Sequence, residues 1–122
     1  MPAIKGPGIF LAQFMSDEAP FNDLESIATW AASLGYKGIQ VPTGDTAIFD
    51  LERAANSQEY CDEVMAICKK AGVQISELST HLQGQLVAVH PAYDELFDNF
   101  APEALRGKPA ERTEWAIQQM KW

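Results

Sequence analysis

Twice in this chain, an amphipathic helical pattern stops at a glycine and is followed at once by a short segment typical of a β-strand. The first stop is Gly35, ahead of residues 36–42, and the second is Gly72, ahead of residues 73–79. Glycine is favoured just after a helix because it adopts the left-handed backbone conformation without steric cost. Helices that lead straight into short strands are typical of βαβ units. The pattern therefore predicts an α/β fold with a parallel sheet.

Residues 8–14 are predicted to be the first buried strand of that sheet. The helix after it is expected to begin at Asn22, an N-cap with Glu25 at capping-box spacing. Apolar residues recur there with helical spacing, at Leu24, Ile27, Ala28, Ala31 and Leu34. A helical turn is expected within 48–55. A second long helix is expected to begin near Asn56 or Ser57, with Glu59 placed to complete its cap.

The third strand is predicted to run on through Thr80 and His81 into an irregular stretch, residues 82–109. Short helices are expected there around 93–97 and 102–105. Residues 109–122 are predicted to form a last helix with proline in its first turn. This helix reaches the final residue without a stop signal, so a truncated or split product is expected rather than a complete domain.

Composition and charge narrow the possible partners. The chain is 47% hydrophobic and 21% charged, and its net charge of −8 argues against a nucleic-acid-binding surface. No apolar run approaches the length of about 20 residues that spans a bilayer, and the first residues contain no apolar signal-peptide core. A cytoplasmic protein with no membrane or nucleic-acid partner is therefore expected.

Three segments in order resemble one family. Residues 34–40 (LGYKGIQ) and 71–81 (AGVQISELSTH) are similar to the segments that enter the second and third strands of the xylose-isomerase-like TIM barrel family of sugar phosphate isomerases and epimerases. Residues 8–14 fit its first strand. The resemblance implies that residues 1–122 are the N-terminal part of such a domain. About three parallel βα units would be present, too few to close a barrel of about 250 residues.

The resemblance also implies a chemistry. Members of the family transfer a proton α to the carbonyl of a sugar or sugar phosphate, with a divalent metal (Mn, Mg, Co or Zn) that polarises the carbonyl. The metal ligands and the acid/base carboxylates would lie after residue 122, so no catalytic or metal-binding residue is assigned within the chain. The chain alone is expected to be inactive and to form a homo-oligomer.

Barrel active sites lie at the carboxyl ends of strands, which selects the candidate substrate-binding residues. They are Gln13, Phe14, Gln40, Ser79, His81 and Gln83. Where Gln40 stands, the family frequently has glutamate. A glutamine there can orient a hydroxyl but cannot act as a base. His81 could hydrogen-bond a hydroxyl or carbonyl of the substrate.

Structural roles compete with these assignments. Gln13 and Gln40 could satisfy backbone groups at the end of the sheet, and His81 could be structural or face solvent. His90 is expected to be structural. Phe14 and Trp30 are expected to pack, and Cys61 and Cys68 are expected to be small buried hydrophobes. The acidic group Asp94, Glu95 and Asp98 is expected to form a solvated helix face.

Two other functions remain open. One is an endonuclease branch of the same barrel superfamily that acts on abasic DNA, which the acidic balance does not favour. The other is a non-enzymatic module, in which unpaired sheet edges associate with a partner or with a second copy.

Overall fold

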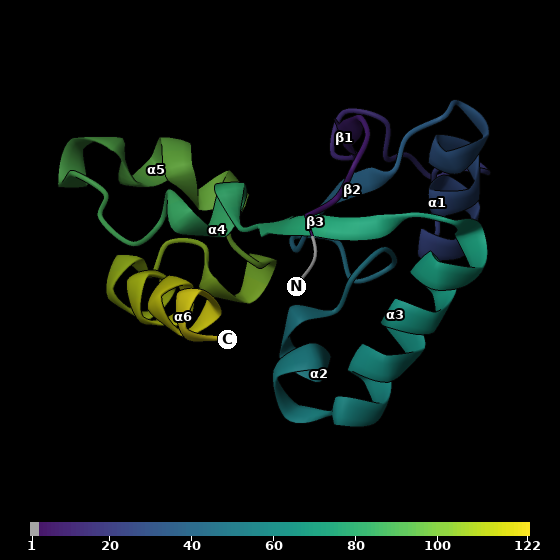
Figure 1. Ribbon diagram of the computed structural model, residues 1–122. Helices are drawn as coiled ribbons and strands as arrows, with labels where there is room; N and C mark the ends of the chain where they lie inside the picture. Colours follow the sequence, from purple (N-terminus) through teal and green to yellow (C-terminus); the bar gives the residue numbers. More distant parts are fainter. Residues whose placement is uncertain (1–2) are drawn as a thin grey trace. The chain divides into compact units, whose positions relative to one another are not determined.

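The computed structural model describes residues 3–122 (Figure 1). The elements of the first part are β1 (Gly8–Phe10), α1 (Leu24–Ser33), β2 (Gly38–Pro42), α2 (Leu51–Asn56), α3 (Gln58–Ala71) and β3 (Gln74–Ser79). Those of the second part are α4 (His81–Gly84), η1 (Pro91–Tyr93), α5 (Asp94–Phe97), η2 (Asp98–Phe100), η3 (Glu103–Leu105) and α6 (Pro109–Lys121). The described chain divides into two compact units, Met1–Ser79 and Thr80–Trp122.

The first unit is built on a parallel sheet. Among the described residues, the sheet has three strands in the order β1-β2-β3, and both pairings are parallel. The α/β class and the parallel sheet predicted from the helix–glycine–strand junctions are confirmed. The sheet is open, with β1 and β3 at its edges within the described part of the chain.

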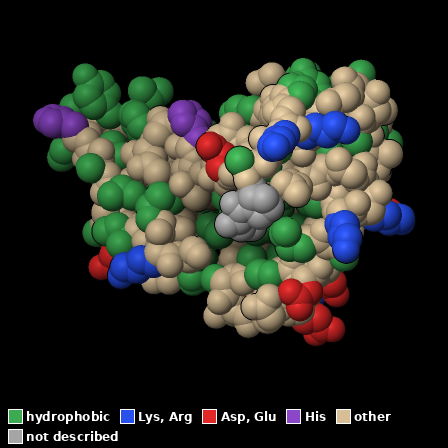
Figure 2. Space-filling model, viewed as in Figure 1, with side chains coloured by type: hydrophobic (Ala, Val, Ile, Leu, Met, Phe, Trp, Pro, Cys, Tyr) green, Lys and Arg blue, Asp and Glu red, His purple; other side chains and the backbone are tan. Residues whose placement is uncertain are grey.

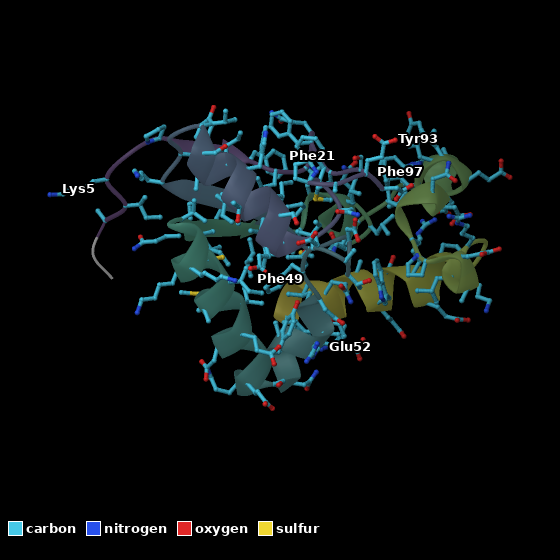
Figure 3. All side chains as sticks on the ribbon, turned by 90° about the vertical axis from the view of Figure 1, so that its right-hand side faces the viewer. Lys5, Phe21, Phe49, Glu52, Tyr93 and Phe97 are labelled. Atoms are coloured by element: carbon cyan, nitrogen blue, oxygen red, sulfur yellow. The ribbon has the colours of Figure 1, made fainter. Side chains whose placement is uncertain are left out.

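Two helices cover one side of this sheet. α1 and α3 pack against each other and lie on the same side of the strands, to the right in Figure 1 and toward the viewer in Figure 3. Parallel strands joined by right-handed crossovers place their helices in this way. Ile39 and Val41 of β2 and Ile27 and Ala31 of α1 are fully buried, so they form the core of the unit.

The predicted glycine stops are confirmed. Gly35 has φ 91° and Gly72 has φ 88°, and both follow the last turn of a helix. A Cβ at either position would meet nothing within 4 Å. The left-handed backbone, and not a lack of space, therefore favours glycine at the two junctions.

The start of α1 differs from the prediction by one residue. Asp23, not Asn22, is the N-cap, and its side chain accepts a 2.8 Å hydrogen bond from the backbone N–H of Ser26. This hydrogen bond is the main reason that the pKa of Asp23 lies below its ordinary value. Both residue types make good caps, so the sequence alone did not separate the two neighbours. The start of α3 is as predicted, since Ser57 accepts a hydrogen bond from the N–H of Tyr60.

The strands are shorter than predicted. β1 ends at Phe10 instead of residue 14, because the chain turns after Leu11 and the N–H of Phe14 donates to the Leu11 carbonyl at 2.9 Å. β2 begins at Gly38 rather than at residue 36. β3 ends at Ser79, and His81 begins α4 instead of continuing the strand. The expected helical turn within 48–55 is present as α2.

The second unit is helical and has its own small core. Leu86, Ala101 and Ala116 are buried at its centre, and the surrounding half-buried side chains include Phe97, Phe100 and Trp115. The short helices predicted around 93–97 and 102–105 are present as α5 and η3. The last helix, α6, is present with Pro109 in its first turn, as predicted.

The acidic group of the second unit is not a solvated face, so that prediction was wrong for two of its three members. Arg112 of α6 is fully buried. It donates to Asp98 at 2.5 Å and to the side chain and backbone carbonyl of Asp94 at 2.7 and 2.9 Å. The second carboxylate oxygen of Asp98 accepts from the N–H of Gly107. The two aspartates therefore neutralise a buried guanidinium, and these ion pairs connect α6 to α5 and η2. Glu95 remains exposed.

No helix within residues 3–122 has the length and apolar character needed to cross a membrane.

The cap geometry predicts that Asp23→Ala lowers the free energy of unfolding by about 1 kcal/mol at neutral pH, because the Ser26 N–H loses its acceptor. The folded-state pKa of Asp23 lies below the unfolded-state value, so the carboxylate's contribution is present at neutral pH and is lost as the pH falls through the folded-state pKa. Urea unfolding from pH 7 down to about pH 3 measures both effects. Asn22→Ala is the control and should change little; an equal loss there would contradict the assignment.

The buried ion pairs of the second unit give another prediction. Asp98→Ala leaves the Arg112 guanidinium with one of its two carboxylates, so the opening free energy of α6 should fall by about 3 kcal/mol. Amide hydrogen exchange of α6 measures it residue by residue. The exposed neighbour supplies the control, since Glu95→Ala should cost less than about 0.5 kcal/mol. Similar losses for the two variants would contradict the structural role of Asp98.

Candidate functional site

A register shift between β2 and β3 determines which side chains lie on each face of the sheet. Ile39 pairs with Ile75, but the next residue of β2, Gln40, pairs with Glu77. Ser76 is therefore an extra residue in β3, a β-bulge. Without it, Gln40 would lie opposite Ser76 and Glu77 would point to the other face, because side chains alternate along a strand.

The bulge separates apolar from polar side chains. On the face toward α1 and α3, Ile75 and Leu78 of β3 lie beside Ile39 and Val41 of β2. The opposite face collects the hydrogen-bonding residues of the two strands, which are Gln40, Gln74, Ser76, Glu77 and Ser79. An ideal Cβ on Gly38, which points to this second face, would lie 3.6 Å from the Cβ of Ser76. This second face is called the polar face below.

Gln40 and Glu77 form the centre of the polar face. The side-chain amide of Gln40 donates a hydrogen bond to the Glu77 carboxylate. Gln40 is half-buried and Glu77 is exposed, so one carboxylate oxygen is engaged and the group remains open to solvent. The arrangement offers hydrogen-bond acceptors on Glu77 and on the Gln40 carbonyl oxygen.

The carboxyl ends of β2 and β3 are held together just beyond this pair. Thr43 donates to the carbonyl of Ser79 twice, through its backbone N–H at 2.9 Å and through its hydroxyl at 3.1 Å. Thr43 is buried and Ser79 is half-buried. These bonds fix the sheet end next to the predicted site residue Ser79.

The two candidates after β1 have different surroundings. Gln13 is exposed in the turn that follows the strand. Phe14 packs on Trp30 of α1 with ring centroids 4.9 Å apart, and Phe21, labelled in Figure 3, packs edge-on against Trp30 with ring centroids 5.1 Å apart. The predicted packing role of Phe14 and Trp30 is confirmed.

The remaining candidates, His81 and Gln83, belong to the second unit. His81 is exposed, and the side-chain amide of Gln85 donates to its Nε2 at 3.2 Å. Gln83 is only 3% exposed. His90, predicted to be structural, caps η1 by accepting the N–H of Ala92 on its Nδ1. The candidate residues are thus divided between the two units. The first unit contains Gln13, Phe14, Gln40 and Ser79, and the second contains His81 and Gln83.

The described residues do not assemble a metal centre. No group of three or more His, Cys, Asp or Glu side chains within residues 3–122 is placed to hold a metal ion. The family resemblance implies that the ligands of its divalent metal lie after residue 122, so no chemical step is assigned to a metal here. Both cysteines are free. Cys68 is buried, and burial raises the pKa of its thiol, which favours the inert protonated form.

On the face that Figure 2 views, lysine and arginine side chains lie in small groups separated by other residues and not in one extended basic patch. A nucleic-acid groove needs a concentrated positive surface.

Sequence reasoning named Gln40 and Ser79 as candidates but did not name Glu77 and Thr43, which hydrogen-bond to them. Regular alternation along residues 73–79 would place Glu77 on the same face as Ile75. The bulge that turns it over depends on pairing with β2. A single carboxylate inside an otherwise uncharged strand is the one signal that could have marked it.

Comparison of the chain with protein-family models and with curated proteins finds no match.

Proposed function

We propose that this chain is the N-terminal part of a xylose-isomerase-like barrel, belonging to a metal-dependent sugar or sugar phosphate isomerase or epimerase. The family resemblance of residues 8–14, 34–40 and 71–81 supports the proposal. The observation that carries it is the polar face, because a parallel sheet buried in an ordinary core has apolar side chains on both faces. In a barrel, the face away from the helices points to the interior, and its side chains near the carboxyl ends of the strands line the active site.

The chain's own residues would bind and orient the substrate. Gln40, held by Glu77, can donate to and accept from sugar hydroxyls, and Ser79 can do the same at the strand end. The divalent metal of the complete enzyme would polarise the carbonyl. The acid/base carboxylates are expected to lie after residue 122, and the chain alone is expected to be inactive.

A second candidate function is a module that associates through its sheet edge. Three features favour it: the open edge of β3, the 44% exposure of Leu78 and the 53% exposure of Met65. A surface hollow of about 480 Å³, lined by residues that include Met65, Cys68 and Val73, lies beside this edge. The two functions differ in what covers the edge of β3. In the enzyme it would be later strands of the same barrel, and in the association module it would be a second copy of the chain.

The enzyme proposal predicts that the reading frame continues beyond Trp122. Its whole product, with Mn²⁺ or Mg²⁺, should exchange the proton α to the carbonyl of a ketose or ketose phosphate with solvent deuterium, because isomerases and epimerases both remove it. Proton NMR in D₂O follows the exchange, and EDTA is the control. The 122-residue chain should show none.

A frame that ends at Trp122, or no exchange across a panel of ketoses and their phosphates, would contradict the enzyme proposal and leave the association module. Turnover by the 122-residue chain would overturn its expected inactivity.

A further inference from the structure

The polar face carries a negative charge. Glu77 is the one ionisable residue in the three strands, and none of their residues is a lysine or arginine. Its carboxylate lies on the polar face and is exposed. Any ligand group that comes close to this face therefore meets a negative charge without a cation beside it on the strands.

The cross-strand row that contains Gln40 also includes the apolar side chain of Phe10. Phe10 pairs with Gln40, which pairs with Glu77, so the three side chains share the polar face at one level of the sheet. Neighbouring strands are about 4.8 Å apart, so the row from Phe10 to Glu77 spans about 10 Å. The row therefore offers a ring to the C–H groups of a sugar, and an amide and a carboxylate to its hydroxyls.

We infer that Glu77 is a specificity-determining residue, which accepts hydrogen bonds from the hydroxyl-bearing part of an unphosphorylated sugar and repels a phosphate group from the polar face. Gln40 positions the carboxylate, and the bulge at Ser76 brings it to this face. The inference rests on the proposed function and deepens it, because it states which part of a sugar substrate contacts this sheet.

The electrostatic argument gives the direction of the preference. A phosphate dianion within a few ångströms of Glu77 is repelled even in a solvated site, whereas a hydroxyl gains a charge-assisted hydrogen bond. The free ketose should therefore bind about fivefold more tightly than its phosphate at the polar face. Removing the charge should abolish that preference.

The test is an NMR titration of the ¹⁵N-labelled 122-residue chain with D-fructose and, separately, D-fructose 6-phosphate, each up to about 100 mM. D-fructose should shift the side-chain amide of Gln40 and the backbone amide of Glu77, with the phosphate binding more weakly. Glu77→Gln keeps an acceptor oxygen of the same reach and should weaken D-fructose binding about tenfold. The ratio between the two ligands should then fall to about one.

Two further variants separate charge from fold. Glu77→Asp keeps the charge but shortens the side chain, so it should weaken D-fructose binding while the phosphate remains disfavoured. Glu59→Gln removes an equal charge from the first turn of α3 and should leave both affinities unchanged. A dispersed, native-like spectrum checks that each variant is folded.

Three results would overturn the inference: no shift at Gln40 or Glu77 with D-fructose, tighter binding of the phosphate by the wild-type chain, or unchanged selectivity in Glu77→Gln. Because the readout is binding, it is separate from α-proton exchange. Binding without exchange in the whole product would reject the enzyme proposal and leave only the sugar-binding role of Glu77. Exchange without binding here would reject the role of Glu77 and leave the enzyme proposal.

Discussion

The backbone pairing between β2 and β3, with one extra residue at Ser76, is the constraint on which the first unit depends. It lets Ile75 and Leu78 face the helices while Glu77, which lies between them, faces the other way. An unbulged strand would turn Glu77 toward the helix side and Leu78 toward the opposite face, so the apolar side chains of β3 would no longer share one face of the sheet. The register thus places the apolar side chains of β3 toward the helices and the polar side chains on the opposite face.

Local signals were enough to predict the three long helices and the order of the strands and helices in the first unit. Gly35 and Gly72 adopt φ values that other residues rarely adopt, and Ser57 caps the helix that follows it. Such features depend on neighbours within a few residues, so the sequence displays them directly. The parallel sheet then followed from helices that lead straight into strands.

Features that depend on distant partners were missed. The bulge appears only when β3 is aligned with β2, 37 residues away at the Gln40–Glu77 pair. Likewise Asp98 was predicted to be a solvated residue because its partner, Arg112, lies 14 residues further on. The candidate site was therefore only half predicted, with Gln40 identified on a strand end but its charged partner assigned no role.

The β2–β3 register can be measured directly in a uniformly ¹³C,¹⁵N-labelled sample by interstrand NOEs between backbone protons. The structure predicts that Gln40 and Glu77 are cross-strand partners, that Ile39 pairs with Ile75, and that Ser76 has no partner of its own on β2. A regular ladder with Gln40 opposite Ser76 would place Glu77 on the helix side. That result would contradict both the polar face and the ligand-binding role built on it.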